Sequence, residues 1–95
     1  MKKTGIKKDG GKTQWSLVPW TEMELAVRVL MHGAKKYAPF NWQGLDRVRM
    51  LDALTRHVVA RQQGEVLDKE SGLPHLAHAV CEALFVMWHD NGDKP

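Results

Sequence analysis

The sequence predicts an all-α fold with three main helices. Three segments carry apolar side chains at the three- and four-residue intervals of an amphipathic helix, and residues typical of helix ends border them. No segment shows the strict polar–apolar alternation of a half-buried strand. A chain of 95 residues makes one domain, which we place at residues 15–90. A basic N-terminal tail at residues 1–14 and a polar tail at residues 91–95 flank it.

The first helix is expected to begin just after Thr21. Thr21 and Glu24 have the spacing of a capping box, and Trp20 and Leu25 have the spacing of a hydrophobic staple. Gly33 is the expected left-handed residue that ends the helix. These end signals together predict a helix of about three turns.

The second and third helices have end signals of the same kind. Asp46 is placed to cap a helix over residues 47–63, which ends at Gly64. An acidic turn follows, and Ser71 is placed to cap the third helix. Pro74 suits the first turn of that helix, where a missing N–H has no cost.

The chain ahead of these helices is rich in Lys and Gly, and residues 1–14 are expected to be poorly ordered. The apolar segment WSLVPW at residues 15–20 is compatible with an extended N-terminal arm or a brief strand. Much of the net charge of +3 comes from five lysines near the N-terminus, Lys2, Lys3, Lys7, Lys8 and Lys12. Such a cluster attracts phosphate-bearing partners, although a solvated tail explains it as well. Nucleic-acid binding is the least favoured hypothesis, because no helix is clearly basic.

Composition limits the remaining possibilities. No run of apolar residues is long enough to span a membrane, and no secretory signal is apparent, so a cytoplasmic location is expected. Cys81 is the single cysteine, which excludes an internal disulfide. A domain this small buries a modest fraction of its surface, so we expect a homo-oligomer, a dimer or larger.

The third helix has two unlike faces. Imidazole and carboxylate groups gather on one of them, where His75, His78, Glu82 and His89 share a stripe. These groups are able to hold a divalent cation. The alternative, that His75 and His78 only bond to neighbouring turns, stays open here. The broad apolar side carries Leu76, Val80, Ala83, Leu84 and Met87.

Other segments supply residues of matching chemistry. His57 borders the apolar face of the second helix and is expected to point toward the third helix. The acidic turn brings carboxylates next to the histidines in sequence, at Glu65, Asp68 and Glu70.

The loop after the first helix combines cations with aromatic rings. Lys35 and Lys36 are suited to bind phosphate, and Asn41 is suited to read a base edge. Three rings are candidates to stack on a base or to serve the core, namely Tyr37, Phe40 and Trp42. Together with the histidines, these groups describe a nucleotide pocket.

The order of these motifs resembles a known family. GKTQWSLVPW, VLMHGAKKY, NW and DALTRHVVARQQGEVLDKESGLPHLAHAVC follow one another as in the phage-associated dATP/dGTP diphosphohydrolase N-terminal domain family. That family is similar to the MazG-like all-α nucleotide pyrophosphohydrolases. The resemblance covers about residues 11–85. It implies a MazG-like helical bundle, completed by oligomerisation, that cleaves purine deoxynucleoside triphosphates to the monophosphate and pyrophosphate with Mg²⁺ or Mn²⁺.

The resemblance also implies roles for the matching positions. The expected catalytic residues are His57, His75, His78 and Glu65. The expected metal ligands are His57, His75, His78, Asp68 and Glu70. The expected substrate-binding residues are Lys35, Lys36, Tyr37, Asn41, Trp42 and Arg56.

The chain departs from the MazG-like pattern in one respect that supports an alternative. It lacks the ExxE and ExxD pairs of two consecutive helices, and Glu82 stands where the resemblance leads us to expect an amide. A site altered in this way is also compatible with a non-catalytic phage nucleotide-binding protein. Such a protein would sequester a cyclic-nucleotide or other nucleotide-derived immune signal.

Overall fold

A computed structural model describes residues 4–92, so the first three residues of the basic tail and the last three of the polar tail lie outside the described residues. The elements are the 3-10 helices η1 (Trp15–Leu17) and η2 (Asn41–Gly44) and the helices α1 (Trp20–Lys36), α2 (Arg47–Gln62) and α3 (His75–Asp90). No strand occurs within residues 4–92, so the all-α class is confirmed. None of these helices is long and apolar enough to cross a membrane.

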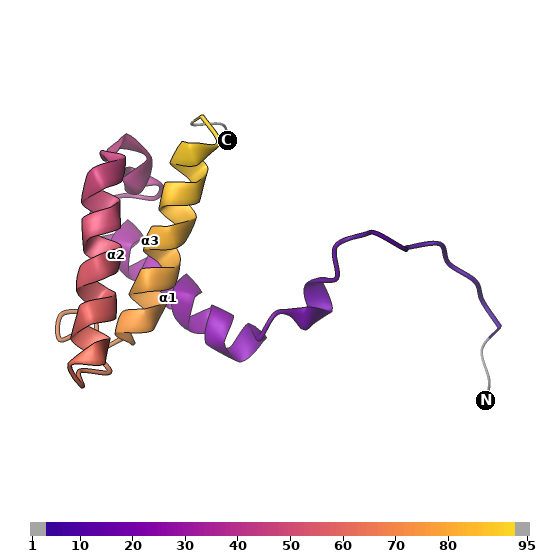
Figure 1. The fold of residues 1–95 in the computed structure, drawn as a ribbon, viewed down its shortest axis with the longest axis horizontal. Helices are drawn as coiled ribbons and strands as arrows, with labels where there is room; N and C mark the ends of the chain where they lie inside the picture. The colour runs from indigo at the N-terminus through magenta and orange to yellow at the C-terminus, as the bar shows by residue number, and fades with distance from the viewer. Residues whose placement is uncertain (1–3, 93–95) are drawn as a thin grey trace.

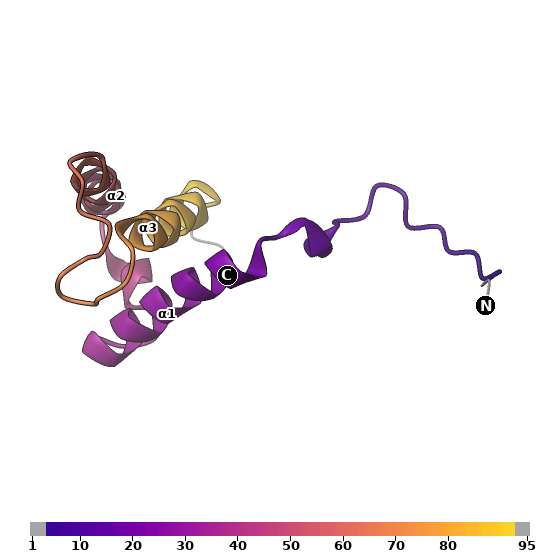
Figure 2. The ribbon, with the colours of Figure 1, turned by 90° about the horizontal axis from the view of Figure 1, so that it is seen from below.

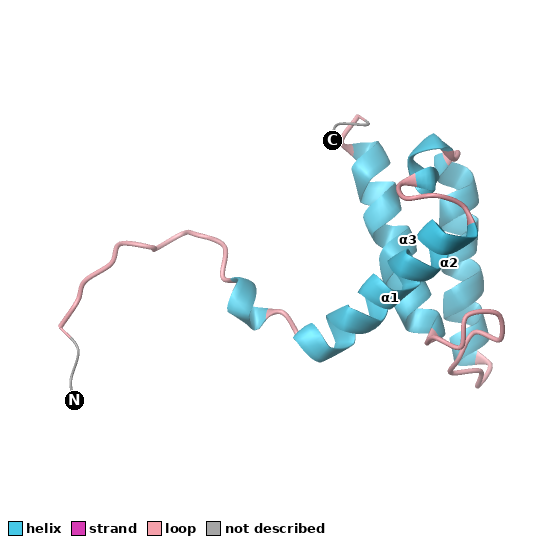
Figure 3. Cartoon of the chain, turned by 180° about the vertical axis from the view of Figure 1, so that it is seen from behind, coloured by secondary structure: helices cyan, strands magenta, loops and turns pink. Residues whose placement is uncertain are grey.

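The three α-helices form an open arrangement around α3. Helices α2 and α3 run side by side, and α1 crosses α3 at a slant (Figures 1 and 2). The loop between α1 and α2, which contains η2, lies near the C-terminal end of α3. The acidic turn lies at the N-terminal end of α3 (Figure 3). Helix α3 therefore contacts every other main element. The MazG-like bundle and its completion by a second copy stay predictions.

Helix α1 begins earlier than its end signals predict. The carbonyl of Pro19 accepts the N–H of Met23 at 2.9 Å, so Trp20 is already helical. Thr21 is therefore inside the helix, and the prediction that it caps the helix is wrong. Because Trp20 is the first helical residue and remains 56% exposed, the predicted hydrophobic staple is wrong too.

The other end of α1 also differs from the prediction. The helix passes through Gly33, whose carbonyl accepts the N–H of Tyr37 at 2.9 Å, and continues to Lys36. Gly33 has no positive φ, so the predicted left-handed cap is wrong. A glycine inside a helix costs about 1 kcal/mol, which contacts of the last turn, such as the pair of Lys36 with Glu70, help to offset. The extension carries Lys36 toward the acidic turn.

The segments that flank α2 and α3 follow the sequence more closely. The side chain of Asp46 accepts the N–H of Val48 at 3.3 Å, which confirms the predicted cap of α2. Gly64 has a φ of 101° just beyond α2, as expected of a helix-ending glycine. Pro74 lies immediately before α3, and no side chain caps that helix. The prediction for Ser71 is wrong, because its hydroxyl is used inside the acidic turn.

Residues 15–17 form the short helix η1 and not a strand. Ahead of it, residues 4–14 contain neither helix nor strand and lead away from α1 (Figure 1). The packing of this segment as an arm stays a prediction.

Small side chains allow α1 and α3 to approach closely. The buried cluster between them consists of Ala26, Val29, Ala77 and Cys81. The Cys81 thiol donates to the Ala26 carbonyl at 3.2 Å, and burial raises its pKa to about 12. The thiol is therefore a packing group, held protonated at neutral pH.

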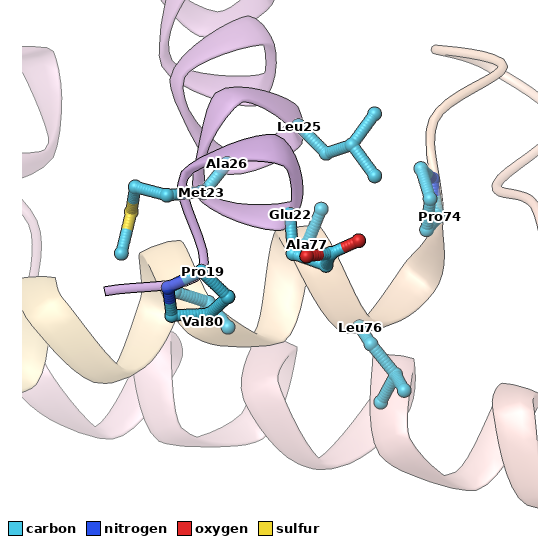
Figure 4. A pocket seen from close by; sticks show the side chains of 9 residues that line it. All are labelled: Pro19, Glu22, Met23, Leu25, Ala26, Pro74, Leu76, Ala77 and Val80. Carbon is cyan, nitrogen blue, oxygen red and sulfur yellow. The ribbon is translucent and has the colours of Figure 1, made fainter. Parts of the chain in front are cut away.

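The broad apolar side of α3 is largely exposed in the single chain. Leu76 is 50% exposed, Leu84 is 44% exposed and Met87 is 59% exposed. Near the start of α1 this surface borders a cavity of about 310 Å³, where Met23 and Ala26 of α1 lie close to Val80 of α3 (Figure 4). The histidine face of α3 is the one that turns inward.

Candidate functional site

Three histidine rings meet where α2 lies against the start of α3. The Nδ1 atoms of His57 and His75 are 2.8 Å apart, and the ring of His57 stacks on His78 with centroids 4.5 Å apart. His75 is only 5% exposed. The prediction that His57 points toward the third helix is confirmed, because both its ring contacts come from α3. Helical spacing places His75 and His78 on one face, so the cluster follows from the HxxH pattern.

The partners of His75 determine its hydrogen-bonding state. Its Nε2 lies 2.6 Å from Oε1 of Glu65, and a carboxylate only accepts, so Nε2 carries a proton. When His75 is neutral, its Nδ1 is then a free acceptor. In the absence of a cation it accepts a hydrogen bond from Nδ1–H of His57. A histidine that ligates a metal commonly donates its other N–H to a carboxylate in this way.

The acidic turn is built around Asp68. Its carboxylate accepts the backbone N–H and the hydroxyl of Ser71, each at 2.9 Å. The Ser71 hydroxyl also lies 2.7 Å from Nε2 of His78. Because its hydroxyl links Asp68 to His78, Ser71 positions both side chains. The sequence does not indicate this role, because the position of Ser71 before the third helix suggests a helix cap.

Glu70 lies apart from the cluster of His57, His75 and His78. Its carboxylate pairs with Lys36 and lies 3.5 Å from His32 on the last turns of α1. Hydrogen bonds from Lys36 and His32 lower the pKa of Glu70, and the hydrogen bond to Glu70 raises the pKa of Lys36. Lys36 and His32 are four residues apart and share one helix face, a signal present in the sequence. The turn is thereby tied to α1.

Three of the predicted metal ligands come together. One donor atom each from His57, Asp68 and His75 lies within 4.8 Å of the other two. Two imidazoles and one carboxylate suit a divalent first-row transition ion. The structure therefore brings together three of the five predicted ligands, with His78 beside them and Glu70 elsewhere.

Burial lowers the pKa of His57 and His78, which favours the neutral form that binds a cation. Desolvation lowers the pKa of His57, and the neighbouring His78 and His75 lower it further. Desolvation likewise lowers the pKa of His78, which Asp68 partly opposes. Burial acts to raise the pKa of Asp68, but hydrogen bonds from Ser71 and the nearby histidines outweigh it and lower the pKa. At neutral pH His57 and His78 thus favour the neutral imidazole and Asp68 the ionised carboxylate, which are the forms that ligate metals.

A cavity of about 700 Å³ opens beside this cluster, between the end of α1, the loop of η2 and the pair α2–α3. Its walls include most of the predicted site residues, namely Lys36, Tyr37, Asn41, Trp42, Arg56, His57, Asp68, Glu70 and His78. Three predicted residues are not part of its lining. Glu65 and His75 contact one another outside the lining, and Lys35 is exposed. The size is that of small-ligand sites in general.

Aromatic rings line the far end of the cavity. Trp42 stacks on Phe85 of α3, with centroids 4.4 Å apart and an interplanar angle of 10°, and meets Trp88 edge-on. Phe40 is 67% exposed and Tyr37 is 64% exposed. Trp42 therefore serves packing on one face, whereas the two exposed rings remain accessible to a ligand.

His89 does not join the stripe that the sequence predicts. Its Nε2 lies 3.5 Å from the carbonyl of Trp42, near the end of α3 opposite to the histidine cluster. The helical spacing is correct, but α3 contacts different elements along its length. A shared face therefore does not make a shared site.

Glu82 is a cavity residue that the sequence places in the polar stripe of the third helix with His75 and His78. Its Oε2 is buried and has no hydrogen-bond partner within residues 4–92. Burial raises the pKa of Glu82, and the nearby Arg56 opposes this effect only in part, so the pKa is about 7. A buried carboxyl group without a partner is rare and is commonly explained by an absent ligand, ion or water.

Replacing Glu82 with glutamine is expected to stabilise the metal-free protein at pH 8 by about 1–2 kcal/mol, with little change at pH 5. The pKa of Glu82 is raised from an ordinary 4.5 to about 7, so its favourable contribution is complete below 4.5 and is lost as the pH rises through 7. Glutamine stays neutral and avoids this loss. Urea unfolding of both proteins at the two pH values measures the difference. An equal effect at pH 5 and pH 8 would show that the carboxyl group is not held protonated by burial.

Comparisons with known proteins show which family the chain is similar to. A family described as "dATP/dGTP diphosphohydrolase, N-terminal" matches residues 2–94. A protein of Salmonella phage PMBT28 that is named dATP/dGTP diphosphohydrolase is 45% identical over 85 residues. These residues are 90% of this chain and 29% of that relative, so the chain spans less than a third of the relative's length. No solved structure matches.

Proposed function

The chain belongs to the dATP/dGTP diphosphohydrolase N-terminal domain family, as its motif order predicts, and we propose that it is a metal-dependent diphosphohydrolase of purine deoxynucleoside triphosphates. One observation carries the proposal. A single cavity is lined by cations, by accessible aromatic rings and by two members of the histidine–carboxylate cluster, His57 and Asp68. These are the groups needed for phosphates, a base and a divalent cation. The 45% identical relative comes from a phage, and we propose the same origin for this chain.

Lys36 and Arg56 are the proposed phosphate-binding groups. Both line the cavity, one from the last turn of α1 and one from α2 next to His57. Lys36 is paired with Glu70 in the free protein, so a triphosphate would compete for its ammonium group. Asn41 and the exposed rings of Tyr37 and Phe40 are available to the base.

His57, Asp68 and His75 are the proposed ligands of the cation. The donor set favours a transition ion such as Mn²⁺ over Mg²⁺, which prefers oxygen ligands throughout. Such an ion, when bound, polarises phosphoryl oxygens and promotes ionisation of the attacking water. Glu65 holds the ring of His75 in the orientation that presents Nδ1.

The proposed reaction is attack of water on the α-phosphorus. The bond from that phosphorus to the oxygen shared with the β-phosphate breaks, and pyrophosphate leaves. His78 lines the cavity, and its lowered pKa keeps it neutral at pH 7, so it is able to accept the proton released by water. Asp68 and Ser71 fix the position of its ring.

The test is an assay of pyrophosphate and deoxynucleoside monophosphate with the four deoxynucleoside triphosphates. We expect both products from dATP and dGTP with Mn²⁺, and none after chelation. Arg56→Ala should raise the KM about tenfold by removing a phosphate contact. Arg49→Ala is the matched control, because Arg49 is exposed on the same helix and does not line the cavity.

The assay also separates hydrolysis from binding alone. A chain that binds a nucleotide tightly in the presence of Mn²⁺ and returns it unchanged is not a hydrolase. That outcome would support the alternative of a nucleotide-sequestering protein, and calorimetry with cyclic di- and trinucleotides would follow. If neither turnover nor binding of any nucleotide were found, both functions would be wrong.

A further inference from the structure

Glu82 occupies a distinctive place in the cavity. It follows His78 by one helical turn and precedes Phe85 by one turn, and all three side chains line the same space. At a rise of 1.5 Å per residue, Glu82 lies about 6 Å along α3 from His78, and Phe85 lies about 10 Å along α3 from His78. The histidine cluster marks the phosphate end of the proposed site. Glu82 therefore lies between the phosphate end and the aromatic end, where a nucleoside would extend.

The hydrogen bonding of Glu82 is incomplete in the free protein. Its Oε2 is buried without a partner, and Arg56 is the charged group whose field reaches it. Every other buried side-chain oxygen or nitrogen within the described residues has a partner. A buried acceptor that is left unsatisfied carries a desolvation cost, which a ligand that donates hydrogen bonds would remove.

Resting on the proposed function, we propose that Glu82 binds the Watson–Crick edge of the purine base and sets a preference for guanine over adenine. An ionised carboxylate offers two acceptors and no donor. Guanine presents two adjacent donors on that edge, N1–H and the 2-amino group, and so matches both oxygens. Adenine presents a donor at its 6-amino group but an acceptor at N1, which would face a carboxylate oxygen unpaired.

The first experiment compares dGMP and dAMP, which are the products of the proposed reaction. Their dissociation constants are measured by calorimetry at pH 8, where Glu82 is mostly ionised. We expect the protein to bind dGMP at least about tenfold more tightly than dAMP. Glu82→Gln should abolish or reverse this ratio, because an amide offers one donor and one acceptor and so matches adenine. An unchanged ratio in the folded variant would overturn the proposal.

A second experiment needs no variant. Deoxyinosine monophosphate keeps N1–H but lacks the 2-amino group, so it loses one of the two hydrogen bonds to Glu82. We expect the unaltered protein to bind it about tenfold more weakly than dGMP. Equal affinities, or no binding of any of these monophosphates, would contradict the assignment of Glu82 to the base.

The third measurement separates a base-reading role from a metal-binding one. Mn²⁺ is titrated into the protein without nucleotide, and Glu82→Gln should leave its affinity unchanged. A tenfold loss of Mn²⁺ affinity would assign Glu82 to the cation instead. These binding ratios do not depend on turnover. Failure of the hydrolysis assay therefore leaves this proposal testable, and its own failure leaves the hydrolase proposal intact.

Discussion

Replacing His75 with alanine is expected to lower the turnover of dATP and dGTP by at least about 100-fold. The change removes a proposed cation ligand and takes the His75 hydrogen bond away from two atoms, Oε1 of Glu65 and Nδ1 of His57. His75 is the most buried member of the cluster, so water replaces its contacts poorly. The measurement is kcat for pyrophosphate release at saturating Mn²⁺, with a Mn²⁺ titration by calorimetry beside it.

His89→Ala is the control for this experiment. His89 lies on the same helix but near the carbonyl of Trp42, away from the cluster. Glu65→Gln should have a smaller effect, about 10-fold to 100-fold, because Glu65 orients His75 without taking part in the cation site directly. Thermal melting shows whether each variant is folded. A folded His75→Ala protein that keeps its turnover would exclude His75 from the catalytic site.

The sequence predicts the histidine cluster well because the relevant geometry is local. His75 and His78 are three residues apart on one helix, and the acidic turn that bonds to them immediately precedes that helix. His57 requires one further step, which is the pairing of α2 with α3. A short chain with few connections leaves few ways to pair them, so the apolar face beside His57 is a sufficient guide.

Other features depend on packing that spacing does not describe. The apolar face of α3 predicts a buried side, yet Leu76 and Met87 are exposed while Ala77 and Cys81 are buried. Close approach of α1 selects small side chains, and the larger apolar groups remain outside. The predicted homo-oligomer would cover such a face. Likewise, glycine commonly ends a helix, but α1 continues past Gly33. Its last turn reaches the acidic turn through Lys36, and this contact arises only after folding.

Trp42→Ala is expected to lower the free energy of unfolding by about 3 kcal/mol. The sequence leaves two roles for this ring, stacking on a base or packing. One face of Trp42 lies on Phe85 at 4.4 Å and its edge meets Trp88, so loss of the ring removes contacts that join the η2 loop to α3. Urea unfolding monitored by circular dichroism measures the effect.

Phe40→Ala is the matched comparison for Trp42→Ala. Phe40 is 67% exposed and lies tilted at 6.4 Å from Trp42, so its loss should cost less than about 1 kcal/mol of stability. If Phe40 stacks on the base, the same variant should weaken dGMP binding several-fold. Equal destabilisation by the two variants would contradict the assignment of Trp42 to packing. The two roles that one aromatic–polar loop suggests are then divided between neighbouring rings, with Trp42 fixing the loop and Phe40 meeting the ligand.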